Sequence, residues 1–346
     1  MHQVREVAFP ERIIDRHVGG NTTYARYLAQ GLRDRGVTVS RIRSGRNAPL
    51  TALQETLQGM RRPVAGKVLH YSADTGPLLP TRGPSVVTVH GVASRWISTA
   101  RNPRQEKIWR TRVARAIAST NAIITVSQSS ADDVSAVFDV PQERITTIHH
   151  GIDLAHFVAR REPTAVMESL AGRPYVLYLG NIEPRKNLIE LVEAFKHPSV
   201  VQLGVRLVIA GKPAWNAQES MAAIESGPVD YLGFVSDDDR VALMQHARLF
   251  AFPSLYEGFG FPVLEAMAAG TPVLTSNRGS LAEVAGPAMV IEDVSRDGIA
   301  EGLIRALQQE TPSEQTIAEG KAWASRFTWD ASLEQHLAVY NSVTAA

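Results

Sequence analysis

Two glutamates, Glu257 and Glu265, are separated by seven residues in the stretch YEGFGFPVLEAMAAGTP, which covers residues 256–272. Gly258 and Gly260 lie between them, and glycines allow the backbone N–H groups of a turn to point at one ligand. Such a turn at the start of a helix makes a cradle for an anion such as phosphate. The stretch therefore predicts an anion site with a carboxylate on each side of it.

The helix after this turn is expected to begin near Pro262 and to end at Gly270, residues that favour these two positions. Glu265 is then expected in its first turn, where a carboxylate can accept two hydroxyl hydrogen bonds, as a ribose offers. Glu257 precedes the turn and is expected to face whatever group the phosphates carry.

Two adjacent cations, Arg185 and Lys186, follow the strand-like run YVLYLG in the segment GNIEPRKNL. Arginine grips a diphosphate with parallel hydrogen bonds. A basic pair at a helix start is disfavoured by the helix dipole unless an anion approaches it. Gly19 and Gly20 form a weaker signal of the same kind, before a helix that Asn21 or Thr22 is expected to cap, although a turn that simply needs glycine explains them equally well.

Short apolar runs alternate with helical patterns along nearly the whole chain. The expected strands are VREVAF, VTVSRI, KVLHYS, SVVTVH, AIITVS and RITTIHH in the first half, and YVLYLG, RLVIAG, VDYLGF, RLFAFPS, PVLTS and AMVIE in the second. The expected helices are GNTTYARYLAQGLRDRG, QEKIWRTRVARAIAS, SSADDVSAVF and NLIELVEAF. Such alternation predicts an α/β protein with doubly wound parallel sheets, whose ligands bind at the carboxyl ends of the strands.

The chain has 346 residues, enough for two domains. We expect an N-terminal domain over residues 1–165 and a C-terminal domain over residues 174–325, with a polar connector near 155–173. The segment after residue 311 holds no strand pattern, and FTWDASLEQHLAVY predicts an amphipathic helix over about 328–346.

Composition excludes some classes of protein. The chain has no cysteine, so disulfides and thiolate metal sites are absent, and no signal peptide or membrane-spanning run is recognisable in the sequence. Residues 1–160 hold 22 Lys and Arg against 12 Asp and Glu (+10), and residues 161–346 hold 14 against 23 (−9), which together give the net charge of +1. The basic first half indicates an anionic partner, although a drift of surface charge without purpose explains it too.

The spacing of Glu257 and Glu265 in EGFGFPVLE resembles that of the retaining, nucleotide-sugar-dependent glycosyltransferases of family 4, which have the GT-B architecture of two Rossmann-like domains. Further matching segments follow the family's order, and they are GG at 19–20, TVHGV at 88–92, ITVSQSSADDV at 124–134, HHGIDLAHF at 149–157 and GNIEPRKNL at 180–188. The likeness covers nearly the whole chain. It implies that the C-terminal helix crosses back to the N-terminal domain.

The resemblance assigns roles to the matching positions. Arg185 and Lys186 would neutralise the donor diphosphate, and Glu265 would hold the ribose. Glu257 and His90 would contact the donor sugar. The remaining donor contacts that it implies are Gly19, Gly20, Gly258, Phe259, Gly260 and Phe261, and Val235 in the loop near Phe234-Val235 that would touch the base.

One position departs from the pattern, since Asn181 stands where many relatives have arginine, so the diphosphate contacts are not simply copied. The Arg185-Lys186 pair resembles the mannosyl- and rhamnosyltransferase subgroup, which slightly favours a GDP-mannose-like donor. No metal or other cofactor is expected. The run Asp237–Asp239 is interpreted as a helix cap with acids that complement the helix dipole, and His149-His150 as structural.

The acceptor is expected to be a glycan, a lipid-linked molecule or a small molecule, and an anionic acceptor is one of the options. No nucleic-acid partner is expected. The basic segment 101–115, with Arg101 and Trp109, is a candidate for peripheral membrane contact, although a solvated helix explains it equally well. The expected location is the cytoplasm, with the inner face of the membrane as an open alternative. A sugar-nucleotide 2-epimerase and a non-catalytic nucleotide-sugar-binding protein are the competing interpretations.

Overall fold

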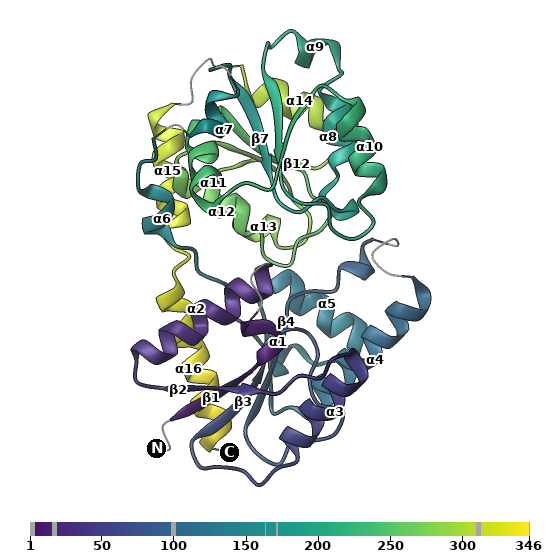
Figure 1. Ribbon diagram of the computed structural model, residues 1–346, viewed down its shortest axis with the longest axis vertical. Coiled ribbons are helices and arrows are strands. Elements are labelled where there is room, and N and C mark those ends of the chain that lie inside the picture. The colour runs from purple at the N-terminus through teal and green to yellow at the C-terminus, as the bar shows by residue number, and fades with distance from the viewer. Residues whose placement is uncertain are drawn as a thin grey trace. The chain divides into compact units, whose positions relative to one another are not determined.

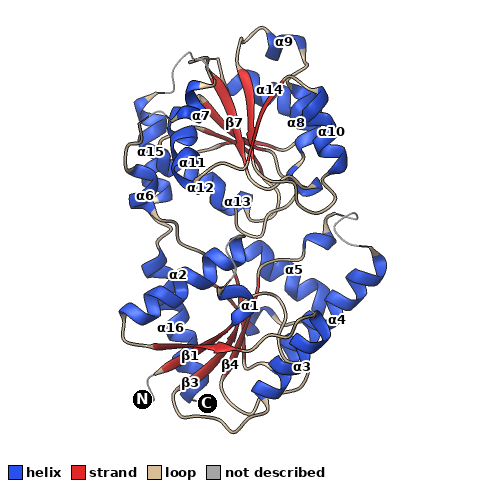
Figure 2. Cartoon of the chain, viewed as in Figure 1, coloured by secondary structure: helices blue, strands red, loops and turns tan. Residues whose placement is uncertain are grey.

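The computed structural model describes residues 4–15, 19–97, 102–162, 164–170, 172–308 and 313–345. The chain forms two compact units, one of Met1–Gly151 with Phe327–Ala346 and one of Ile152–Arg326. Each unit contains a six-stranded sheet in which every neighbouring pair of strands is parallel (Figures 1 and 2). No helix within the described ranges is both long and apolar enough to cross a membrane.

The sheet of the first unit has the strand order β2-β1-β3-β4-β5-β6. Its strands are β1 (Glu6–Pro10), β2 (Thr38–Ile42), β3 (Lys67–Tyr71), β4 (Ser85–Val89), β5 (Ala122–Thr125) and β6 (Ile145–Thr147). Its helices are α1 (Glu11–Ile14), α2 (Gly20–Asp34), α3 (Ala48–Gly59), α4 (Pro103–Ser119), α5 (Gln128–Phe138) and α16 (Trp329–Ala345), with short 3-10 turns at Ala93–Arg95 and Gln142–Arg144.

Alternate residues of these strands supply two different cores. In β1, Val7 and Phe9 enter one core and Ala8 the other, and in β4 Val86 and Val87 divide in the same way. This follows from the two-residue period of a strand, which sends neighbouring side chains to opposite faces. Both faces are covered by helices, so the inner strands β1, β3, β4 and β5 are largely buried, whereas the edge strand β2 is mostly exposed or half-buried.

The C-terminal helix α16 packs on the first unit, where it lies beside α2 (Figure 1). Leu333, Val339 and Tyr340 are buried in the same core as Leu28 and Leu32 of α2. The return of this helix to the N-terminal unit confirms the expectation from the sequence.

The sheet of the second unit has the order β12-β11-β10-β7-β8-β9. Its strands are β7 (Tyr175–Leu179), β8 (Arg206–Ala210), β9 (Val229–Gly233), β10 (Leu249–Phe252), β11 (Val273–Ser276) and β12 (Met289–Ile291). Its helices are α6 (Leu154–Val158), α7 (Ala165–Glu168), α8 (Leu188–Ala194), α9 (Pro198–Val201), α10 (Gln218–Ser226), α11 (Asp237–His246), α12 (Phe261–Ala269), α13 (Leu281–Val284), α14 (Arg296–Ala306) and α15 (Glu314–Ala324), with a 3-10 turn at Pro184–Lys186.

The predicted strands all occur at their expected places, some of them shorter than the apolar runs, which confirms the α/β class with two doubly wound sheets. The unit boundary differs from the expected one, because residues 152–165 group with the second unit. Phe157 of α6 is buried there, and α6 packs on α12. Helix α3 was not predicted at all.

Candidate active site

The loops after β7 and β10 meet at the carboxyl edge of the sheet of the second unit. These two strands are neighbours, and the chain continues from β7 to β8 on one side and from β10 to β11 on the other. In a doubly wound sheet such a switch point leaves a crevice for a ligand. The loop after β7 carries Arg185 and Lys186, and the loop after β10 carries Glu257.

These three residues form a buried ion cluster with Glu183. Lys186 Nζ lies 2.6 Å from Glu257 Oε1, and an Arg185 guanidinium nitrogen donates to Glu257 Oε2. The second terminal nitrogen of the Arg185 guanidinium, Nη2, lies 2.6 Å from Glu183 Oε1. Two positive and two negative groups therefore balance one another. The basic pair is not a solvated pair at a helix start, since Lys186 is buried.

The cluster changes the pKa values of its members. Burial raises the pKa of the Glu257 carboxyl, but the charges of Arg185 and Lys186 outweigh this effect and lower it to about 2. Burial and the neighbouring Arg185 together lower the pKa of Lys186, against the effect of Glu257. Glu257 is thus an ionised carboxylate across the physiological range.

The backbone of Glu257 is fixed by the loop after β11. Ser280 donates to the carbonyl oxygen of Glu257 from its amide nitrogen at 3.1 Å and from Oγ at 3.0 Å. Gly279 has a φ of +60°, and a Cβ there would lie 2.6 Å from that same oxygen. Only glycine fits so closely in this conformation. The chain is therefore built to hold Glu257 in place.

Helix α12 begins at Phe261 and follows Gly260 as its N-cap, so the Gly258–Phe261 turn does lie at a helix N-terminus. Glu265 is the fifth helical residue, and the prediction that it lies in the first turn was wrong. The helix starts one residue before Pro262, which occupies its second position. Gly270 ends the helix as expected, in a left-handed conformation.

Glu265 is paired with Arg240 of α11, a residue that the sequence analysis did not single out. Arg240 Nη1 lies 2.9 Å from Glu265 Oε2, and another nitrogen of the same guanidinium lies 2.7 Å from Asp237. Burial raises the pKa of Glu265, and Arg240 opposes this effect. No local pattern in the sequence signals this pairing, because it depends on the packing of α11 against α12.

An exposed aromatic ring stands at the carboxyl end of β9. Phe234 is 65% exposed, and Lys212, which follows β8, places Nζ 3.9 Å from the centre of its ring. Val235 is the next residue and is half-buried. A flat, accessible ring at this edge suits stacking on a nucleobase, so Phe234 is a better candidate for a base contact than Val235.

In the first unit, Gly19 is itself the N-cap of α2, so the expected cap at Asn21 or Thr22 was wrong. Gly19 has a φ of +105°, a backbone conformation that is strained for any residue with a side chain. A Cβ at this position would nevertheless meet no other atom within 4 Å. Gly19 accepts hydrogen bonds from the amides of Thr22 and Thr23. The backbone conformation, rather than crowding, requires glycine here. Gly20 is the first helical residue.

His90 directly follows β4 and is held at two points. Its amide donates to Asp74 Oδ1 at 2.7 Å, and its Nε2 lies 2.9 Å from the carbonyl oxygen of Ser72. Because a carbonyl only accepts, Nε2 carries the hydrogen. Burial lowers the pKa of His90, against the effects of Asp74 and Ser72. In the neutral ring Nδ1 is therefore a hydrogen-bond acceptor.

Behind His90 lies a chain of buried hydrogen bonds whose direction is fixed. His336 Nδ1 lies 2.7 Å from the carbonyl oxygen of Ser332 and must donate to it. Burial lowers the pKa of His336 to about 4, so its Nε2 accepts from the Tyr24 hydroxyl at 2.7 Å. Tyr24 in turn accepts from Thr88 Oγ1 at 3.0 Å.

The same chain continues through His70 to the C-terminal helix. Thr88 Oγ1 accepts from His70 Nε2 at 2.7 Å, and His70 Nδ1 accepts from the Tyr340 hydroxyl at 2.7 Å. Helix α16 is thus joined at two points to α2, β3 and β4. The Tyr24 ring also lies edge-on to the His90 ring, with centroids 5.2 Å apart.

The acidic run at 237–239 forms the start of α11, where its charges complement the helix dipole. Ser236 caps α11, Asp237 pairs with His156 at 2.7 Å, and Asp238 lies 3.6 Å from Arg161. His150 is buried and its ring lies 4.7 Å from that of Tyr24. Within the described parts of the chain, no three His, Asp or Glu residues are grouped as a metal ion would need.

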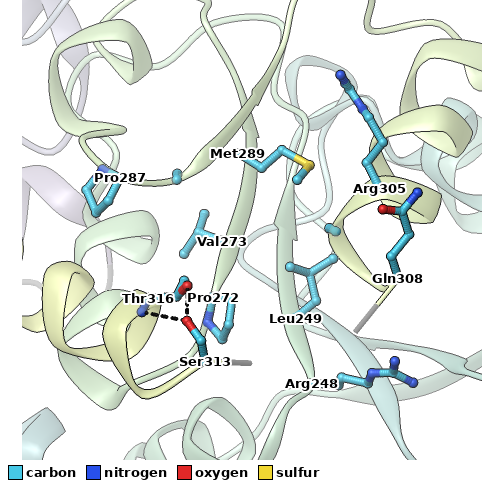
Figure 3. Close-up of a pocket in the computed structure, with 12 residues that line it drawn as sticks. Arg248, Leu249, Pro272, Val273, Pro287, Met289, Arg305, Gln308, Ser313 and Thr316 are labelled. Carbon is cyan, nitrogen blue, oxygen red and sulfur yellow. Dashed lines mark hydrogen bonds between the residues drawn. The ribbon is translucent and has the colours of Figure 1, made fainter. Parts of the chain in front are cut away.

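A pocket of about 380 Å³ lies at the amino ends of the strands in the second unit, opposite the carboxyl ends where the candidate site lies (Figure 3). It is lined by Leu249, Val273 and Met289, the first residues of β10, β11 and β12. Ligands of doubly wound sheets bind at the carboxyl ends of the strands. Because Glu257 follows β10 at that other end, this pocket is separate from the candidate site.

Comparison with known proteins agrees with this geometry. Residues 159–323 match glycosyl transferases group 1, and residues 67–156 match glycosyltransferase family 4. O-antigen chain mannosyltransferase B of Escherichia coli is 34% identical over 232 residues, which are 64% of this chain and 61% of the relative. The serotype-specific mannosyltransferase WbdA of the same species is 32% identical over 236 residues, which are 63% of this chain and 28% of WbdA. The matches thus span less than two thirds of these relatives.

Two solved structures share the fold. HepE of Anabaena, solved in complex with UDP and glucose, has a TM-score of 0.74 at 16% identity, covering 98% of this chain and 100% of HepE. Sucrose-phosphate synthase of Thermosynechococcus elongatus has a TM-score of 0.76 at 17% identity, covering 99% of each chain. The fold is therefore GT-B. The two family matches agree with the resemblance of the chain to the family 4 glycosyltransferases, and the mannosyltransferase relatives fit the subgroup expected from the sequence.

Proposed function

We propose that this protein is a metal-independent, retaining glycosyltransferase that moves a hexose from a nucleoside-diphosphate sugar to a hydroxyl group of a glycan, glycolipid or small molecule. A GDP-mannose-like donor is favoured, because the relatives described above include mannosyltransferases. The observation that carries the proposal is the buried cluster of Arg185, Lys186 and Glu257 at the switch point of the sheet.

Cleavage of the bond to the sugar places negative charge on the leaving diphosphate, and fixed cations and N–H groups stabilise that charge. Arg185 is the more exposed of the two cations, with 24% of its side chain accessible against 6% for Lys186. We assign Arg185 to the diphosphate and Lys186 to holding Glu257. The ion cluster has no net charge. The positive end of the α12 dipole, at Gly258–Phe261, therefore adds stabilisation of the negative diphosphate that the cluster does not supply.

Glu257 is assigned to the donor sugar, where a carboxylate that remains ionised stabilises positive charge at the reacting carbon. Glu265 is assigned to the ribose and Phe234, with Val235, to the base. In the first unit, Gly19 and Gly20 are assigned to the donor, and His90 offers Nδ1 to a sugar hydroxyl. Retention of configuration is carried over from the family resemblance.

The first test is calorimetric titration of GDP, UDP, dTDP and ADP with EDTA present. We expect one nucleotide to bind with a Kd of about 1–100 µM, which is about −8 to −5.5 kcal/mol. Binding that appears only after magnesium is added would overturn metal independence. No binding in either condition would overturn the assignment of the cluster as a donor site.

Turnover separates an enzyme from a binding protein. We expect the wild type to release sugar slowly from its donor in the absence of acceptor, and the Glu257→Ala variant to lose this release while it still binds the nucleotide. Circular dichroism checks that the variant is folded. Undiminished turnover in the folded variant would show that Glu257 has no part in the reaction.

A further inference from the structure

Helix α3 packs on the first unit through polar and small residues, which reverses the usual arrangement of a surface helix. Its buried residues are Thr51, Ala52, Glu55, Thr56 and Gly59. Hydrogen bonds hold this face in place: Thr51 Oγ1 donates to the carbonyl of Gly45, and Arg12 lies 3.2 Å from Glu55.

The opposite face of α3 is an exposed apolar stripe. Leu50, Leu53, Leu57 and Met60 are 44%, 52%, 52% and 40% exposed. Their spacing of three, four and three residues places them on one side of the helix. Val64 is exposed just beyond the helix end. We define these five residues as the α3 stripe.

Arginines flank the stripe at both of its ends. Arg43 and Arg46 precede the helix, Arg61 and Arg62 follow it, and all four are exposed. Within the described part of the chain, none of the four forms an ion pair with an acidic side chain. Glu55 is the only acidic residue between positions 43 and 64, and it is buried. The exposed surface of this segment is thus apolar in the middle and positive at both ends.

We propose that the α3 stripe is a membrane-docking surface that lies flat on an anionic lipid bilayer. Leucine side chains would enter the boundary between headgroups and acyl chains, and the arginines would meet the phosphates of the headgroups. The charge pattern favours lipid over a second copy of the chain. A symmetric dimer through this stripe places the same patch on both partners, which brings four arginines against four arginines with no exposed acid between them.

Helix α4, which the sequence suggested for membrane contact, lacks such a stripe. Its Val113, Ala116 and Ile117 are buried, and Trp109 packs against the core. Ile108 is its one large apolar side chain that the structure describes as exposed. Arg101 lies outside the described residues. Of these two helices with arginines in or beside them, α3 is therefore the one with several exposed apolar side chains to insert.

The test is flotation of the full chain with vesicles of phosphatidylcholine, alone or mixed with phosphatidylglycerol. We expect binding to the anionic vesicles, weaker binding to phosphatidylcholine alone, and loss of binding in high salt as charges are screened. The L53Q/L57Q variant is expected to lose about tenfold or more in vesicle affinity, since each leucine contributes apolar burial. Both leucines are already exposed, so the fold is retained. The matched control V158Q/V201Q alters two exposed valines of the second unit and is expected to bind as the wild type does.

A second pair of variants tests whether the membrane is contacted by α3 or by α4. R61Q/R62Q is expected to weaken binding to anionic vesicles about tenfold, and R104Q/K107Q in α4 is expected to change it little. Equal binding by the wild type and L53Q/L57Q would overturn the proposal, as would no binding of the wild type to anionic vesicles. Sedimentation that shows a wild-type dimer and an L53Q/L57Q monomer, without a loss of vesicle binding, would assign the stripe to self-association instead.

Discussion

Lys186 Nζ lies 2.6 Å from Glu257 Oε1, and both side chains are buried. The two residues are 71 positions apart in the chain and come from loops that follow neighbouring strands. Their pairing places a carboxylate and two cations at the switch point of one sheet. This contact holds the charged part of the candidate site together before any donor is present.

Removal of the carboxylate should destabilise the second unit. Glu257→Gln leaves Arg185 and Lys186 with only Glu183 to compensate their two charges, and breaking a buried pair in this way costs about 3–5 kcal/mol. Chemical denaturation measures this loss in the free energy of unfolding. Glu193→Gln is the control, because its pair with Lys196 is largely exposed and such pairs contribute about 0–1 kcal/mol. Equal effects of the two substitutions would contradict the role of the cluster.

The stabilisation by Glu257 should depend on pH with a definite sign. Its pKa is lowered to about 2 in the folded protein, against an ordinary value of about 4.3. The unfolded state therefore takes up the proton first as the pH falls, and the stabilisation is present above about pH 4.3 and is lost between there and about pH 2. Urea unfolding at several pH values should show that wild type and Glu257→Gln converge in this range. A difference that stays constant down to about pH 3 would argue against an ionised Glu257.

The contact with the ribose predicts a loss of nucleotide affinity. Glu265→Ala is expected to weaken binding by about 1–3 kcal/mol, the cost of losing hydrogen bonds to a charged group. Calorimetry with the nucleotide that binds best measures this change. Glu219→Ala, at an exposed position of α10, is expected to leave affinity unchanged. Wild-type affinity in Glu265→Ala would remove Glu265 from the site.

The proposed contact of Phe234 with the base predicts a loss of affinity for nucleotides but not for inorganic pyrophosphate. Phe234→Ala is expected to weaken nucleotide binding by about 1–3 kcal/mol, the contribution of stacking one base on an aromatic ring, and to leave the binding of inorganic pyrophosphate unchanged. Phe234→Trp keeps a ring and should retain most of the affinity. An equal loss for nucleotide and pyrophosphate would mean that Phe234 acts on the diphosphate or on the fold.

The histidine network makes the first unit sensitive to acid. Burial lowers the pKa of His336 to about 4, so between about pH 6.5 and about pH 4 the unfolded state binds a proton that the folded state does not. Stability then falls as the pH falls, by up to about 3 kcal/mol for this residue. We expect the His336→Gln variant to show a flatter dependence of unfolding free energy on pH. A slope identical to that of the wild type would exclude His336 as the source.

Residue patterns alone predicted much of the fold. Each expected strand is found, because strands buried on both faces are continuous apolar runs bounded by glycine, proline or serine. Helix α3 was missed because its leucines face solvent while its polar face packs inward. Its Asn47 cap and Pro49 were the available signals, since Asn47 accepts from the Leu50 amide at 3.0 Å.

The sequence by itself determined the order of the strands and of the helices that it predicted, the candidate residues Glu257, Glu265, Arg185 and Lys186, and the resemblance to the family, because these depend on local periodicity and on motif spacing. Only the tertiary structure decided which charged and polar side chains meet. Lys186 with Glu257, Arg240 with Glu265 and Tyr340 with His70 join residues that are 71, 25 and 270 positions apart. Such pairs arise where the sheet and its helices bring distant loops and faces together, and no local pattern in the chain records that proximity.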